Sequence, residues 1–317
     1  MKLGVSECLL GTQCRYDGTG AKDKYVVNIL QNYFELEAYC PEKIIFGTPR
    51  ETIRQVEVDN NIEIHTNQSK KNVTVELAKI SNELADEALE EELCGFILKS
   101  KSPTCGMERV KVYQPIVNAP NEKKGVGLFA KALRERYPYL PMEEEGRLED
   151  AWLRENFLMQ IFAYKGIHQF MKTKPKMKDL IAFHTSYKYL IYAKSTVAYK
   201  ILGNIVANNK KQSLEELLND YYHEFLVAIN EKGNISKTYN VLLHIYGYFK
   251  KLISADEKEH MLTAIEEFKQ GVIPLIAVIK LLNLHVKRFN MDYLKVQKFL
   301  NPYPAELGLR SNIKAYK

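Results

Sequence analysis

The chain has 317 residues, of which 46% are hydrophobic and 26% charged. This length allows two domains, and the composition is ordinary for a globular protein. No apolar run approaches the ~20 residues of a membrane span, and Met1–Ser6 lacks the features of a signal peptide. We therefore expect a soluble, cytoplasmic protein that does not bind a membrane.

Charge differs between the two halves of the chain. Residues 1–150 carry 20 Lys and Arg against 25 Asp and Glu, whereas residues 151–317 carry 25 against 14. The second half therefore has a net charge of +11. Such a surface suits nucleic acid, because lysines near phosphates gain by counterion release. The alternative is that the lysines lie on solvated helix faces.

The first 150 residues alternate short apolar strands with helical segments. The expected strands are Lys2–Val5, Leu36–Cys40 and Gly95–Leu98, and the expected helices are Tyr25–Phe34, Val73–Leu93 and Gly125–Tyr137. This alternation predicts an α/β domain with a mostly parallel, Rossmann-like sheet. Ligands of such sheets lie beyond the carboxyl ends of the strands.

From about Asp150 the apolar residues follow a helical period throughout. The expected helices cover residues 151–170, 178–195, 197–208, 213–230, 236–252, 255–270, 274–286 and 292–299. Ser213 and Glu216 indicate a capping box at the start of one of them. The sequence therefore predicts an α/β domain over residues 1–148, followed by an all-α helical domain over 149–317 with its core at about 178–310.

Five cysteines occur, and all lie in the first domain: Cys8, Cys14, Cys40, Cys94 and Cys105. An odd number without a secretory signal is not typical of a disulfide framework. Three of them, Cys8, Cys40 and Cys105, lie at or after the end of an expected strand, so they are predicted to meet at one edge of the sheet. The alternative is a set of unrelated buried thiols, since free cysteine packs well in cores.

Thiolates in such an arrangement select zinc, copper(I) or an iron–sulfur cluster. Structural zinc is usually held by close pairs such as Cys-x-x-Cys, and the chain has no such pair. Three widely separated ligands on a four-iron cluster leave one iron open, and an open iron is a Lewis acid. Spacing alone leaves a zinc-bound or metal-free protein open.

Several motifs narrow the choice, and they occur in a fixed order: Cys8-Leu9-Leu10-Gly11, Arg15-Tyr16-Asp17-Gly18, Cys40-Pro41-Glu42, Gly47-Thr48-Pro49-Arg50 and Ser102-Pro103-Thr104-Cys105-Gly106. At these motifs the chain resembles the TudS-like thiouracil desulfidases, over residues 1 to about 145. The resemblance implies a [4Fe-4S] cluster held by Cys8, Cys40 and Cys105. The fourth iron would be free to take the sulfur of a thiolated base.

The activity that this resemblance implies is non-redox, hydrolytic desulfuration of a small-molecule thiolated nucleobase such as 2- or 4-thiouracil, with a nucleoside or RNA as a variant substrate. We expect Glu42 to transfer protons and Ser102 to hydrogen-bond the substrate. The alternative for Glu42 is a structural ion pair with Arg50 or a place beside a helix N-cap. The alternative for Ser102 is a turn residue.

Four further residues are predicted to bind substrate at the same edge. Arg15, Asp17 and Arg50 either line the substrate site or order its loops, and Asp17-Gly18 is an ordinary turn signal. Lys99, at the end of the buried strand, is expected to point into the same crevice.

Two cysteines remain outside the predicted ligand set. If Cys14 were a fourth ligand, the cluster would be closed and better suited to electron transfer or sensing. A non-catalytic redox sensor or nucleic-acid-binding protein is therefore the alternative function. Cys94 precedes the buried strand and is most simply a core thiol.

The second half resembles the YbgA-like helical domain, for which the resemblance offers no activity. The matching segments are Phe183-His184 with Lys188, residues 240–250, Pro274-Leu275 and residues 302–307. We expect His184 and His244 to be hydrogen-bonded core residues rather than ligands. Its basic surface makes tRNA or another RNA a candidate partner.

Overall fold

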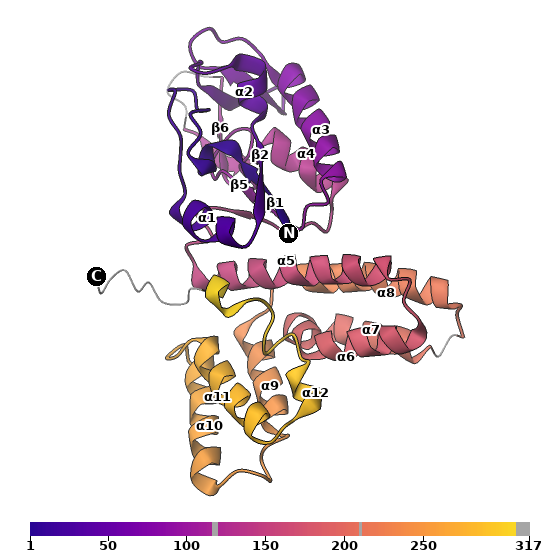
Figure 1. Cartoon of the computed structure of the whole chain (residues 1–317). Coiled ribbons are helices and arrows are strands. Elements are labelled where there is room, and N and C mark those ends of the chain that lie inside the picture. Colours follow the sequence, from indigo (N-terminus) through magenta and orange to yellow (C-terminus); the bar gives the residue numbers. More distant parts are fainter. Residues whose placement is uncertain (116–119, 209–210, 309–317) are drawn as a thin grey trace. The chain divides into compact units, whose positions relative to one another are not determined.

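A computed structural model of the chain describes residues 1–115, 120–208 and 211–308. It divides into two compact units, Met1–Phe157 and Leu158–Lys317, which run from indigo to magenta and on to yellow in Figure 1. The predicted boundary at 148 stays a prediction, and residues 309 and 310 of the predicted helical core lie outside the described part. No helix of the described chain is long and apolar enough to span a bilayer.

A four-stranded parallel sheet forms the centre of the first unit. Strand β1 (Lys2–Ser6) pairs with β2 (Glu35–Tyr39) on one side and β5 (Phe96–Leu98) on the other, and β8 (Met142–Glu144) pairs with β5. All three residues of β5 are buried, as expected of a central strand. The predicted mostly parallel α/β fold is confirmed.

Close packing around β1 requires a glycine at position 4. A Cβ atom built there would lie 2.2 Å from Cε2 of Phe96, so no larger residue fits without displacing the ring. The Phe96 ring is held in turn by Tyr39 and Phe129, at centroid distances of 5.2 and 5.6 Å. The glycine therefore permits an aromatic cluster between the sheet and helix α4 (Leu128–Arg136).

Replacing Gly4 with alanine is therefore expected to destabilise the first unit by about 1–3 kcal/mol, the usual cost of overpacking a core. Urea denaturation of the two proteins measures the difference. Gly146→Ala is the matched control, because its Cβ would meet no atom closer than 3.6 Å. Equal stability of the two variants would contradict the packing argument.

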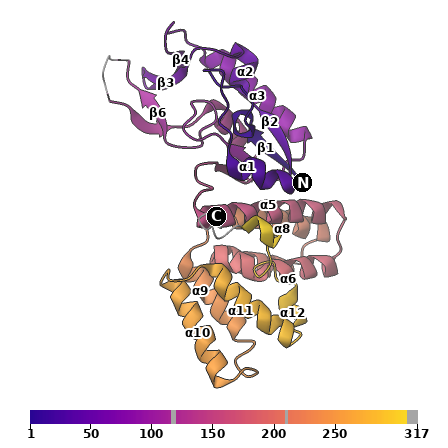
Figure 2. The same cartoon turned by 60° about the vertical axis from the view of Figure 1, so that its left-hand side comes forward.

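A second sheet was not predicted from the sequence. It has the order β4-β3-β6-β7, and its strands are β3 (Ile53–Val58), β4 (Asn61–Thr66), β6 (Val110–Tyr113) and β7 (Glu122–Gly125). Figure 2 shows β3, β4 and β6 together, apart from β1 and β2. A signal was present: Asp59 and Asn60, both with positive φ, join two segments of alternating polarity, which is typical of a hairpin turn.

The remaining helices of the first unit are α1 (Lys24–Asn28), α2 (Pro41–Phe46) and α3 (Thr74–Glu90). Helix α2 was not predicted, and the helix expected over Tyr25–Phe34 is wrong in length. Instead, α1 ends at Asn28 and a 3-10 turn follows over Leu30–Asn32. The β-branched residues Val26, Val27 and Ile29 lower the helix propensity of this segment, because they lose side-chain freedom in a helix.

The second unit is helical, as predicted. The chain enters it through α5 (Ala151–Lys172), in which the boundary between the units lies, and continues through α6 (Met177–Lys194), α7 (Thr196–Ala207), α8 (Leu214–Asn230), α9 (Ile235–Tyr246), α10 (Ala255–Lys269), α11 (Leu275–Arg288) and α12 (Asp292–Lys295).

Sequence patterns predicted the helix starts better than the helix ends. The capping box of Ser213 and Glu216 is present at the start of α8. The helices expected over 236–252 and 292–299 are wrong at their C-terminal ends, which lie at Tyr246 and Lys295. Gly247 follows α9 directly and accounts for the first early end, since glycine is a poor helix former.

Candidate active site

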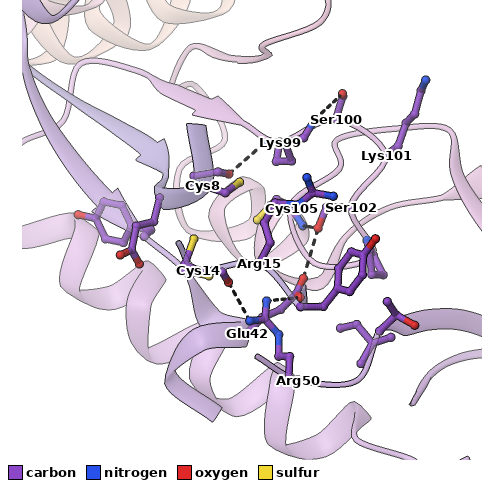
Figure 3. Close-up of a pocket in the computed structure, with 18 residues that line it drawn as sticks. Cys8, Cys14, Arg15, Glu42, Arg50, Lys99, Ser100, Lys101, Ser102 and Cys105 are labelled. Carbon is purple, nitrogen blue, oxygen red and sulfur yellow. Dashed lines mark hydrogen bonds and ion pairs between the residues drawn. The ribbon is translucent and has the colours of Figure 1, made fainter. Parts of the chain in front are cut away.

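Three cysteines come together where three parallel strands end. Cys8 lies in a 3-10 turn directly after β1, Cys40 is the N-cap residue of α2 directly after β2, and Cys105 follows β5 in the next loop. All three line one cavity of about 370 Å³ (Figure 3). The sequence predicted that strand ends would bring these thiols to one edge of the sheet, and the structure places them there.

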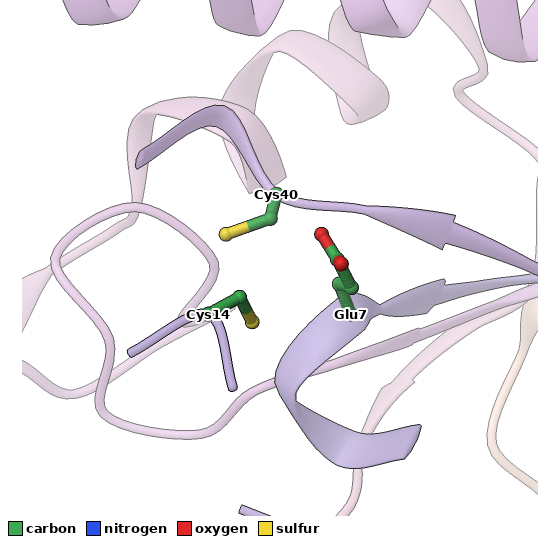
Figure 4. Close-up of side chains that lie close together, drawn as sticks. All are labelled: Glu7, Cys14 and Cys40. Atoms are coloured by element: carbon green, nitrogen blue, oxygen red, sulfur yellow. The ribbon is translucent and has the colours of Figure 1, made fainter. Parts of the chain in front are cut away.

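Cys14 lines the same cavity. The sequence had left open whether Cys14 belongs to the site. Its side chain is 1% exposed, and its Sγ, the Sγ of Cys40 and a carboxylate oxygen of Glu7 lie within 4.8 Å of one another (Figure 4). Cys94 lies elsewhere in the core and donates its thiol to the carbonyl of Lys2 at 2.8 Å. The cavity thus contains four of the five thiols.

The environment of Cys14, Cys40 and Cys105 favours the protonated form of these three thiols. A hydrogen bond with Cys14 and burial raise the pKa of Cys40, and burial raises the pKa of Cys105. For Cys14, a hydrogen bond with Cys40 lowers the pKa, but one with Cys8 and burial raise it to about 12. Because metals bind thiolates, ligation of a metal here would release protons.

Glu42 is fixed at the cavity wall by contacts to both carboxylate oxygens. The guanidinium of Arg50 donates to Oε2 at 2.8 Å, and the hydroxyl of Thr104 donates to Oε1 at 2.7 Å. Ser102 Oγ lies 3.5 Å from the same Oε1 (Figure 3). Glu42 is in the first turn of α2, directly after Pro41, so the Cys-Pro-Glu motif brings a thiol and a carboxylate to one place.

Arg50 connects Glu42 to the loop that contains Cys14. Its Nη1 donates to the carbonyl oxygens of Cys14 at 2.7 Å and Gly47 at 3.0 Å. The side chain is 6% exposed, and its Nε has no hydrogen-bond partner in the described part of the chain. Arg50 therefore orders the loop, and it also lines the cavity.

Ser102 and Thr104 hold the loop that presents Cys105. The hydroxyl of Ser102 accepts hydrogen bonds from the backbone N–H groups of Thr104 at 3.2 Å and Cys105 at 3.1 Å. Thr104 is fully buried, and its contact with Glu42 was not predicted, although it lies inside the Ser-Pro-Thr-Cys motif. Ser102 therefore stabilises the turn, and it also lines the cavity.

The other predicted substrate-binding residues differ in their placement. Arg15 and Lys99 line the cavity, but the ammonium of Lys99 pairs with Glu145. Asp17 does not line this cavity, and it accepts hydrogen bonds from the hydroxyl and backbone N–H of Thr19 at 2.6 and 3.1 Å. The structure thus brings together all the predicted site residues except Asp17, which orders a turn.

The donor set of the cavity fits an iron–sulfur cluster. Cys8, Cys40 and Cys105 supply soft thiol ligands from three separate chain segments, and Cys14 adds a fourth within the same cavity. Soft thiolate donors suit iron–sulfur clusters, whereas a site for Mg²⁺ or Ca²⁺ is built from oxygen ligands.

In the second unit, His184 and His244 differ in their burial. His184 is partly buried, with Nδ1 3.2 Å from the hydroxyl of Tyr221. Burial, and then the charge of Lys188, lowers the pKa of His184 to about 4, so the ring is neutral at pH 7. His244 is exposed on α9, beside the ring of Tyr192, so its predicted place in the core is wrong.

Comparison with known proteins matches both halves of the chain. Residues 3–145 match the model of the 2-thiouracil desulfurase family, and residues 188–304 match the model of a protein family of unknown function, DUF1722. The chain is 26% identical over 157 residues to the uncharacterized protein YbgA of Escherichia coli K12, which covers 49% of this chain and 93% of YbgA.

A solved structure, the [4Fe-4S]-dependent thiouracil desulfidase TudS, is 25% identical, with a TM-score of 0.38, and the match covers 47% of this chain and 93% of that one. The family matches and YbgA confirm the resemblance found in the sequence: this chain joins a TudS-like domain, which matches the 2-thiouracil desulfurase family, to a YbgA-like domain.

Proposed function

We propose that the first unit is a [4Fe-4S]-dependent desulfidase that removes sulfur from a thiolated nucleobase such as 2- or 4-thiouracil. One observation carries the proposal: three cysteines from three strand ends line one cavity together with a carboxylate held by three side chains. The match of residues 3–145 to the 2-thiouracil desulfurase family supports it.

The reaction needs water and no electron donor. The carbon–sulfur double bond of the base is replaced by a carbon–oxygen double bond, and water supplies the oxygen, so the products are the oxo base and hydrogen sulfide. Bound by Cys8, Cys40 and Cys105, the cluster would supply a Lewis-acidic iron for the substrate sulfur. The protein must still position a water and move its protons.

Glu42 is the residue proposed to move these protons. It directly follows Pro41 and Cys40, so its carboxylate lies at the wall of the cavity that contains the thiols. The hydrogen bonds from Arg50 and Thr104 hold it in one orientation, as a positioned general base requires.

Arg15 forms no ion pair in the described part of the chain, so its guanidinium is available to the polar edge of a base.

The test is anaerobic purification followed by iron and sulfide analysis and incubation with 2-thiouracil and 4-thiouracil. About four irons per chain, with sulfide released from a base, is the expected result. A complete cluster without release would overturn the proposed substrate class, and a chain that takes up no iron on reconstitution would overturn the cofactor.

A second candidate function is a non-catalytic cluster protein that senses redox state. The position of Cys14 favours it, because a fourth thiol lies beside Cys8 and Cys40 and its side chain is 1% exposed. Four cysteine ligands complete a [4Fe-4S] cluster and leave no iron for substrate. The number of cysteines on which the cluster depends separates the two functions.

A thiolated RNA is the variant substrate that we propose alongside the free base. The net charge of +11 over residues 151–317 supports it, because such a surface attracts phosphates. Sulfide release from thiolated RNA is expected to slow as salt rises, whereas release from the uncharged base is expected to depend little on salt. Equal salt dependence of the two would argue against RNA.

A further inference from the structure

The second unit has a cavity of its own, between helices α6, α7 and α12, of about 500 Å³. Its size is in the range of small-molecule sites, about 300–1,000 Å³. None of the residues that line it is acidic: they are His184, Thr185, Lys188, Tyr199, Lys200, Gly203, Asn204 and Tyr293. With two lysines and no carboxylate, this lining favours an anion over a metal cation.

Lys188 is a partly buried cationic group in the wall of this cavity. Its side chain is partly buried, yet it forms no ion pair with a carboxylate among the described residues. Its ammonium lies 5.9 Å from the centroid of the Tyr199 ring. A lysine that is half-buried among tyrosines and lacks an acidic partner is well placed to bind an anionic ligand.

Aromatic rings form another part of the same cavity. Tyr293 stacks on Tyr248, with centroids 5.6 Å apart and planes 22° apart, and Tyr189 donates a hydrogen bond to the hydroxyl of Tyr248 at 3.3 Å. This network holds the Tyr293 ring in place at the cavity wall. Because tyrosine faces accept flat aromatic groups, the site suits an anion that also carries a ring system.

Gly203 keeps this cavity open. It lies inside α7, where glycine is the least favourable residue after proline, and a Cβ built there would meet no atom within 4 Å. Packing within the described chain therefore does not require a glycine at this position. Its lack of a side chain leaves room beside Lys188 and Tyr199.

We propose that this cavity binds a nucleotide, with its phosphate on Lys188 and Lys200 and its base against the tyrosine rings. The phosphate belongs either to a free nucleoside monophosphate or to an RNA chain. The site needs no iron and lies wholly in the second unit, so the proposal is independent of the desulfidase activity.

The test is calorimetric titration of the full-length protein with uridine monophosphate, uridine and a short oligouridylate. Lys188→Met removes the charge, and Gly203→Leu fills the cavity. Lys188→Met is expected to weaken uridine monophosphate binding about tenfold or more, as loss of a charge-assisted contact does. Gly203→Leu is expected to weaken it as well, because the leucine side chain occupies space that the ligand needs. Gly203→Leu keeps or raises the melting temperature, because leucine is the better helix former.

Lys280→Met is the matched control, because Lys280 is an exposed lysine on α11 outside the cavity. It is expected to bind as the unchanged protein does. The first unit is identical in all these proteins, so only the binding lost in Lys188→Met and Gly203→Leu is assigned to the helical cavity.

Affinity that rises with oligouridylate length assigns the phosphate to RNA, and equal or weaker binding of the oligomer assigns it to a free nucleotide. Three results would each overturn the proposal. These are equal binding of uridine and its monophosphate, equal binding by Lys188→Met and Lys280→Met, and unchanged binding by a folded Gly203→Leu protein.

Discussion

Glu42→Gln is expected to lower the turnover of thiouracil about 10²–10⁴-fold, the usual contribution of a positioned acid–base group, while the iron content stays unchanged. Glutamine keeps the size of the side chain and can still accept the hydrogen bond from Arg50, and the hydroxyl of Thr104 can reorient. The cavity is therefore preserved, and the group that exchanges protons is lost. Sulfide release and iron content are measured on the same sample.

Two further variants make this result specific. Glu83→Gln changes an exposed carboxylate of α3 and is expected to keep full activity. Thr104→Val removes one hydrogen bond to Glu42 and is expected to cost about tenfold in turnover. Wild-type turnover of Glu42→Gln would refute the proton-transfer role, and loss of iron from it would indicate a structural one.

Serine at Cys8, Cys40 or Cys105 is expected to abolish or strongly reduce the bound cluster, because each variant removes one of three ligands and serine replaces a soft thiolate by a hard hydroxyl. The expected iron content falls from about four per chain toward zero. Iron analysis and the visible absorbance of the cluster measure the loss without any substrate. Full occupancy in all three variants would contradict the proposed ligand set.

Cys14→Ser and Cys94→Ser test whether the cluster also depends on cysteines outside the proposed ligand set. Cys94 lies in the core and donates to the carbonyl of Lys2, so its replacement is expected to leave the cluster intact. The desulfidase proposal also predicts an intact cluster and full turnover for Cys14→Ser. If that variant loses the cluster like the other three, the site has four ligands, and the sensor function is favoured.

The sequence by itself determined the class of each unit and the delivery of three thiols to one place. Cys8, Cys40 and Cys105 follow β1, β2 and β5, and the carboxyl ends of parallel strands share one edge of a sheet. In the second unit, the helical period and the capping box of Ser213 and Glu216 depend on residues that are close together in the sequence. Helices can therefore be predicted there from the sequence alone.

Only the tertiary structure decided which side chains contact one another inside the cavity. Glu42 meets Thr104 across 62 positions of the chain, and Arg50 meets the carbonyl of Cys14 across 36, so no local pattern records either contact. Lys99 lines the cavity, but its ion pair with Glu145 could not be predicted, because Glu145 lies in the loop after β8, a strand that was not predicted.

The pairing of β3 with β6 and the burial of Cys14 both depend on contacts between segments that lie far apart in the chain. Strands β3 and β6 pair although more than 50 residues separate Gln55 from Val112, and a short segment is stable as a strand only with such a partner. Cys14 lies in an irregular loop, where periodicity gives no direction for a side chain. Its loop is held by a hydrogen bond from Arg50, 36 residues further along the chain, and no local pattern records that contact.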